Sequence, residues 1–128
     1  MTKDKALHSY LSAYMEQEFG KVYDVYLKER VPDEAALPYL AYEFVDNSFL
    51  DGDVYITVEL WHHTDNIAYI NEKVHAFREY IETNDMISCD EGYIWIKPGS
   101  PFAQTIPGQN MVSLVGKVIN ITIEYFTA

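Results

Sequence analysis

Residues 53–81 read DVYITVELWHHTDNIAYINEKVHAFREYI, and the spacing of apolar side chains changes partway along this stretch. Over 53–61 apolar and polar side chains alternate, which is the period of a half-buried β-strand. Over 67–81 the apolar side chains recur at intervals of three and four residues, which places them on one stripe of an α-helix. The stretch therefore predicts a strand followed by an amphipathic helix whose stripe packs on a sheet.

The chain upstream of this stretch predicts one more helix and two more strands. Apolar residues at helical spacing predict a helix over 6–19, and Gly20 is placed to end it. The segment 22–27, VYDVYL, predicts a short strand. Alternation over 40–44 predicts the first arm of an antiparallel hairpin whose second arm is the strand that opens the 53–81 stretch.

Downstream, a short strand is predicted over 93–96, and a stretch rich in Pro and Gly follows it as a long loop over 97–111. A last strand is predicted over 118–125, where Ile and Tyr alternate with Val, Asn, Thr and Glu. The expected order is α-β-β-β-α-β-β. We expect an α/β domain of the α+β type, with a mostly antiparallel sheet of four or five strands and two helices on one face.

Composition indicates a single domain over 1–128. The 128 residues are 48% hydrophobic, which is enough for one core. The net charge of −11 repels phosphates, so we expect no tight nucleic-acid binding. No run approaches the roughly 20 apolar residues that span a bilayer, and charges interrupt the N-terminal residues where a signal peptide would need an apolar core. We therefore expect a cytosolic protein with no membrane partner, in which the single cysteine, Cys89, makes no internal disulfide.

Two groups of polar residues suggest a catalytic or metal site, and both are better explained as structural. Glu59 and His63 on one strand face would lie about 13 Å apart, too far to share a metal ion. Glu72, His75 and Glu79 resemble half of a di-iron helix, but that site needs a bundle of four helices. The sequence contains no phosphate loop, dinucleotide fingerprint or nucleophile elbow. We therefore predict no enzymatic activity, no cofactor and no metal.

Two features predict interaction surfaces. The chain has 11 tyrosines, many of them on predicted strands, and outward aromatic residues are typical of interfaces. On the strand that opens the 53–81 stretch, Tyr55 and Trp61 are the predicted oligomer-interface residues. The second feature is the 97–111 loop, which is uncharged after Lys97, and its apolar side chains predict a partner-binding site. These side chains are Phe102, Ile106 and Met111. The alternative is an ordinary surface loop that tucks them onto the domain.

Taken together, these segments resemble the tail-terminator and tail-completion proteins of long-tailed bacteriophages and prophages. The resemblance lies in an N-terminal helix, DVYITVELWHHTDN over 53–66, the helix IAYINEKVHAFREYI over 67–81, a Pro-rich loop and the final strand VINITIEYF over 118–126. It spans most of the chain.

This resemblance implies a minor tail protein whose α/β protomer assembles into a six-fold ring, a homohexamer. The ring caps the tail tube at its head-proximal end and takes part in head–tail joining, so its partners are the tail tube protein and a head-completion protein. It implies a virion structural protein of the tail or neck that is present in the host cytoplasm during assembly. An acidic lumen would let DNA pass without sticking.

Two alternatives remain at this stage. One is another component of the neck, either a head-completion or a stopper protein. The other is a small cytosolic α/β domain with ligand-binding or hydrolytic activity. The assembly state separates the structural class from the small α/β domain. A ring favours a structural protein of the tail or neck, and a monomer with an occupied cleft favours a ligand-binding or hydrolytic domain.

Overall fold

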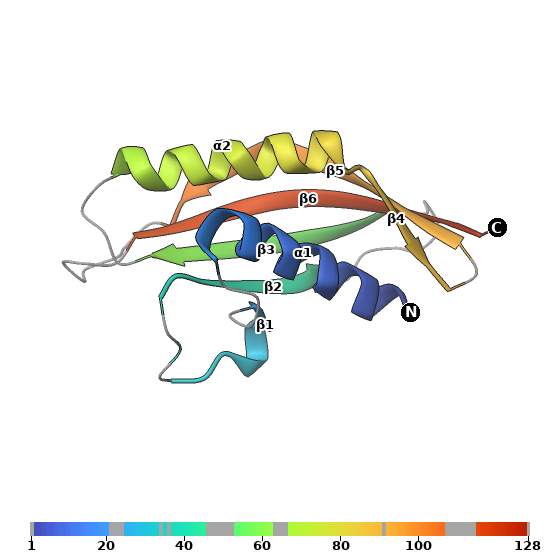
Figure 1. The fold of residues 1–128 in the computed structure, drawn as a ribbon, viewed down its shortest axis with the longest axis horizontal. Coiled ribbons are helices and arrows are strands. Elements are labelled where there is room, and N and C mark those ends of the chain that lie inside the picture. The colour runs from blue at the N-terminus through green and yellow to red at the C-terminus, as the bar shows by residue number, and fades with distance from the viewer. Residues whose placement is uncertain are drawn as a thin grey trace.

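The structure is a computed structural model, and it describes residues 2–20, 25–33, 35, 37–45, 53–62, 67–90, 92–106 and 115–127. Its helices are α1 (Lys3–Phe19) and α2 (Ile67–Thr83). Its strands are β1 (Val25–Leu27), β2 (Tyr39–Val45), β3 (Asp53–His62), β4 (Met86–Cys89), β5 (Gly92–Thr105) and β6 (Val115–Thr127). A short 3-10 helix over Lys28–Arg30 follows β1. Both helices lie on the same side of a curled sheet (Figure 1).

Within the described residues, the strands form one sheet in the order β1-β2-β3-β6-β5-β4. β1 runs parallel to β2, and the other neighbouring pairs are antiparallel. The predicted α+β class with two helices is confirmed. The predicted four or five strands and the order α-β-β-β-α-β-β are wrong, because β4 adds a sixth strand after α2. β4 has only four residues between the end of a helix and a turn, which is too short for alternation to indicate it.

The predicted loop over 97–111 is also wrong as far as Thr105, because β5 continues through it. The pairing of β5 with β6 shifts register between Pro98 and Ala103, so the proline-containing segment forms a break in the ladder. β4 pairs with β5 only as far as Trp95, so beyond it β5 has no described neighbour on that side. Prolines lack an N–H and are tolerated at such edges and bulges, and for this reason Pro and Gly do not end the strand here.

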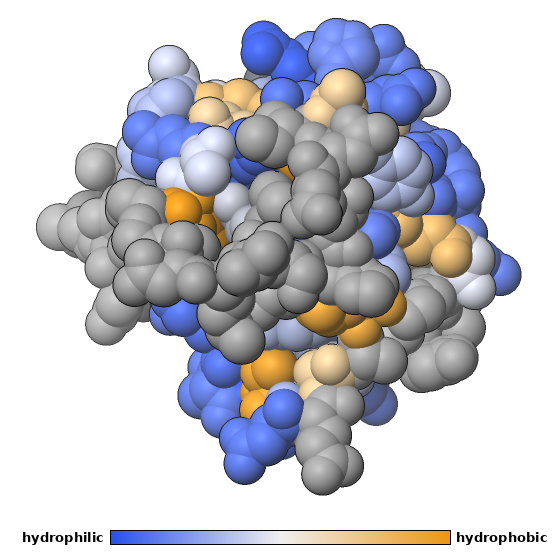
Figure 2. All heavy atoms as spheres, turned by 90° about the vertical axis from the view of Figure 1, so that its left-hand side faces the viewer, coloured by the Kyte–Doolittle hydropathy of each residue, from blue (hydrophilic) through white to orange (hydrophobic). Residues whose placement is uncertain are grey.

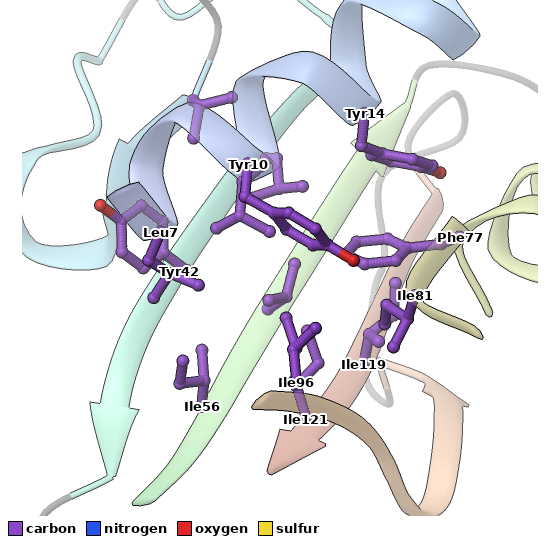
Figure 3. Close-up of a cluster of buried hydrophobic side chains, with 14 of the residues drawn as sticks. Leu7, Tyr10, Tyr14, Tyr42, Ile56, Phe77, Ile81, Ile96, Ile119 and Ile121 are labelled. Atoms are coloured by element: carbon purple, nitrogen blue, oxygen red, sulfur yellow. The ribbon is translucent and has the colours of Figure 1, made fainter. Parts of the chain in front are cut away.

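The core lies between the two helices and the inner face of the sheet (Figure 3). α2 contributes a buried stripe as predicted, made by Ile70, Val74, Phe77 and Ile81. The central strands contribute alternate residues, among them Ile56, Val58 and Leu60 of β3 and Ile119, Ile121 and Ile123 of β6. Because burying one large apolar side chain contributes about 1.5–3 kcal/mol, the packing of α2 on the sheet is a main source of stability.

Two tyrosines of α1, Tyr10 and Tyr14, belong to this core. The ring centroid of Tyr14, a fully buried residue, lies 4.2 Å from that of Phe77. The hydroxyl of Tyr14 donates to the carbonyl oxygen of Lys73 at 2.8 Å, and that of Tyr10 donates to the carbonyl oxygen of Asn84 at 2.8 Å. Burial raises the pKa of both phenols well above the usual value, since apolar surroundings disfavour the charged form. Both tyrosines therefore lie among the apolar residues whose helical spacing predicts the helix over 6–19.

The C-terminal end of α1 is fixed to α2. Gly20 ends α1 in the left-handed conformation with a φ of 71°, as the sequence predicts, and its N–H donates to the carbonyl oxygen of Glu16 at 2.9 Å. The ammonium of Lys73 donates to the carbonyl oxygen of Glu18 at 3.1 Å and lies 3.3 Å from its carboxylate. The same ammonium lies 5.4 Å from the centroid of the Phe19 ring. These contacts restrain the separation of the two helices.

Candidate interaction surface

The outer face of the sheet, opposite the helices, is uncovered in the part of the chain that the structure describes. Alternation along each strand divides its side chains between the two faces. The outward residues of β3 include Tyr55, Thr57, Glu59 and Trp61, and those of β6 include Val118, Asn120, Thr122, Glu124 and Phe126. The two described helices pack on the opposite face, and the side chains of this face contact one another within the sheet.

Four large apolar side chains gather on the outer face where β4, β5 and β6 are neighbours, and we call them the aromatic patch. They are Met86, Tyr93, Trp95 and Phe126, and their exposed fractions are 51%, 46%, 37% and 40%. The register places Met86 opposite Trp95 and Tyr93 opposite Phe126. The ring centroids of Trp95 and Phe126 are 6.2 Å apart. Clustered, exposed aromatic side chains are typical of protein interfaces.

An ion pair borders the aromatic patch. The ammonium of Lys97 lies 4.5 Å from the centroid of the Trp95 ring and 3.5 Å from the carboxylate of Glu124. The side chains of Lys97 and Glu124 are both 32% exposed, so water screens the pair and it contributes little to stability. Its effect is on surface charge, because the cation and the anion beside the patch offset each other.

A hollow of about 320 Å³ lies on the same face at the register break of β5. Across the break, the side-chain amide of Asn120 donates to the carbonyl oxygen of Pro101 at 2.9 Å. Gly99 lies so close to β6 that an added Cβ would meet the backbone oxygen of Asn120 at 2.7 Å, so glycine is required there. The lining residues include Tyr55, Thr57, Ser100 and Thr122. None of these side chains is charged at neutral pH, so the hollow suits neutral polar groups rather than acid–base chemistry.

The predicted interface residues Tyr55 and Trp61 both lie on the outer face, but Tyr55 is the more exposed of the two. Tyr55 is 47% exposed and lines the hollow. Trp61 is half-buried, and its indole N–H donates to the carboxylate of Glu59 at 3.1 Å. A Cβ on Gly116 would come within 2.9 Å of the Trp61 ring, so the ring packs closely on β6. Contacts within the chain thus hold Trp61, and the interface role of both residues stays a prediction.

The three residues assigned to a partner-binding loop have different surroundings. Phe102 is partly buried, with its ring centroid 6.5 Å from that of Phe77 and 5.6 Å from the guanidinium of Arg78. Ile106 is half-buried, and its N–H donates to the carbonyl oxygen of Gly116 at 3.0 Å. Met111 lies outside the described residues. Phe102 therefore packs on the domain, as the alternative reading expects, and partner binding by all three stays a prediction.

The polar groups considered for catalysis or metal binding are dispersed. His75 lies 3.2 Å from the carboxylate of Glu79, and both side chains are exposed on α2. The ring centroid of His62 lies 5.9 Å from that of Phe19 and 5.2 Å from that of Tyr69. His63 lies outside the described residues. Among the residues that the structure describes, no group of three or more His, Cys, Asp or Glu is placed to hold a metal ion.

Sequence reasoning missed the aromatic patch, although part of its signal is present. The alternation over 93–96 separates the buried Ile94 and Ile96 from the outward Tyr93 and Trp95. The remaining members of the patch come from β4 and from the end of β6. Which residues face each other across strands depends on register, and alternation within one strand does not specify it.

Fold and surface together define a two-layer α+β domain with helices on one sheet face and an aromatic patch on the other. Comparison with protein-family models and with curated proteins gives no match. No helix in the described segments is long and apolar enough to cross a membrane.

Proposed function

We propose that the chain is a structural protein of a long-tailed bacteriophage or prophage that caps the tail tube as a ring and joins the tail to the head. Copies of the chain form the ring, six by the resemblance, and DNA passes through its centre. The tail tube protein binds one side of the ring and a head-completion protein binds the other. The chain acts in the tail or neck of the virion and requires no catalytic step, cofactor or metal.

The observation that carries the proposal is the uncovered outer sheet face with its aromatic patch. A protein that functions by assembly needs exposed apolar surface, and a few aromatic anchors usually supply most of the energy of such a contact. The four residues of the patch, each more than one third exposed, meet this requirement. The two helices and the sheet also support the α/β protomer that the resemblance implies.

The charge of the chain supports the passage of DNA. A wall that binds phosphates would gain free energy from counterion release and would retain the DNA. With a net charge of −11, a ring of this chain offers no such gain on average, so DNA slides through it.

The assembly state of the purified chain tests the proposal. Native mass spectrometry is expected to give one closed species whose mass is a whole multiple of 14.8 kDa, and negative-stain electron microscopy is expected to show rings. A closed ring forms when each copy contacts the next head to tail and the rotation between neighbours adds up to a full turn. A chain that remains monomeric at every concentration and salt level, with no rings in the images, would contradict the proposal.

A further inference from the structure

The aromatic patch is a continuous surface at one margin of the sheet. Cross-strand register pairs Met86 with Trp95 and Tyr93 with Phe126. The tilted rings of Trp95 and Phe126, with centroids 6.2 Å apart, connect the two pairs. β4 is the last strand of the sheet within the described residues, so the patch extends to a free edge. On the end of the molecule that faces the viewer in Figure 2, the coloured apolar residues are seen as several small groups.

The charges around the patch restrict what can cover it. Two copies of a chain with a net charge of −11 repel each other, and the repulsion is smallest where the contacting surfaces are locally neutral. Beside the patch, Lys97 and Glu124 compensate each other at 3.5 Å. Asp85 and Asp90 are exposed just outside the two ends of β4, which places them at the margin of the patch. A neutral apolar centre with a polar margin is the usual anatomy of a protein–protein contact.

The same charges argue against other occupants. A nucleic acid or an anionic lipid surface needs free cations, but Lys97 is already paired with Glu124. A basic partner would be attracted to acidic side chains such as Asp85 and Asp90, which lie at the margin of the patch and not at its apolar centre. An apolar surface of a second copy can cover the patch without needing free cations. Contact at a site that is neutral at its centre also keeps the repulsion between the two acidic copies small.

We propose that the aromatic patch is the self-association contact of this chain and that a second copy covers it. The inference rests on the proposed function, and it names the surface through which the copies of the ring meet. Trp95 and Phe126 are the central anchors of the contact. Lys97 keeps the Trp95 ring in place through its position over the ring face.

Two phenylalanines provide a matched test. Phe126 and Phe44 are each 40% exposed, but only Phe126 belongs to the patch. In sedimentation-velocity titrations, Phe126→Ser and Trp95→Ser should each weaken self-association at least about tenfold. Phe44→Ser should associate as the wild type does. Circular dichroism establishes that each variant is folded, and hydroxyl-radical footprinting of the wild type should show that Met86 and Trp95 become protected as the concentration rises.

Salt tests the argument from charge. Raising NaCl from about 0.05 to 0.5 M should strengthen self-association, because screening removes the repulsion between copies and leaves the apolar contact. Weaker association at high salt would overturn the inference, since it would indicate a contact made by ion pairs.

The outcomes also separate this inference from the proposed function. If both patch variants form rings as the wild type does, the patch is not the self-contact and the ring proposal stands. The same holds if they form normal rings that no longer bind tail tubes, because the patch then faces another protein. If the wild type forms no ring at all, both proposals fail.

Discussion

Replacing Phe77 with alanine is expected to lower the free energy of unfolding by about 3–5 kcal/mol. Phe77 is fully buried, and its ring packs on Tyr14 of α1 and on Phe102 of β5. The substitution leaves a cavity where α1, α2 and β5 meet. The ion pair between Lys73 of α2 and Glu18 of α1 restrains the relative position of the two helices, so they cannot shift freely to fill it. Because a small domain has only about 5–15 kcal/mol of stability, the loss should be evident in urea unfolding followed by circular dichroism.

Phe44→Ala is the control for this prediction, since it removes the same ring from a side chain that is 40% exposed. Its effect is expected to stay below about 1 kcal/mol, as is usual for surface substitutions. Equal losses in the two variants would show that Phe77 is not part of the packing between helices and sheet.

The chain is expected to lose stability steeply above pH 10. Burial raises the pKa of Tyr10 and Tyr14 in the folded chain above the ordinary value of 10, which the unfolded chain retains. Below pH 10 both states keep these protons, and the contribution of the two phenols is fully present. As the pH rises above 10 the unfolded state loses the protons first, so folding becomes less favourable. Each tyrosine that stays protonated in the folded chain costs at most about 1.4 kcal/mol per pH unit above 10.

Urea unfolding at pH 8, 10, 11 and 12 measures this loss. Tyr14→Phe should lower stability at pH 8 by about 1 kcal/mol, because it removes the hydrogen bond to Lys73. The same variant should lose stability less steeply than the wild type above pH 10. Tyr93→Phe, which alters a side chain that is 46% exposed, should follow the wild type. If the three proteins decline in parallel, the buried phenol of Tyr14 is not the cause.

The parts of the fold that sequence could predict are those governed by local spacing. The stripe of α2 and the alternation of β6 place the same residues in the core that the structure places there, such as Phe77 and Ile121. Gly20 ends α1 because the left-handed conformation at that position costs glycine little. In these segments the local pattern and the tertiary packing agree.

The parts that sequence could not predict depend on neighbours distant along the chain. Pro98 and Pro101 indicate a loop, yet β5 contains both. Among the described strands β5 has no neighbour on one side there, and the register break with β6 accommodates the missing N–H groups. The spacing over 6–19 places Tyr14 among the apolar residues of α1, but its contact with Phe77 depends on how α1 and α2 pack together. The aromatic patch needs the register of three strands, which no single segment specifies.

The most direct test of the proposed role is to delete the coding sequence of this chain from the genome that carries it, to induce phage production from that genome, and to image the lysate by electron microscopy. We predict DNA-filled heads and separate tails, and infectious virions again when the wild-type chain is supplied from a plasmid. Complete, infectious virions in the deletion lysate would contradict the proposal that the chain caps the tail and joins it to the head.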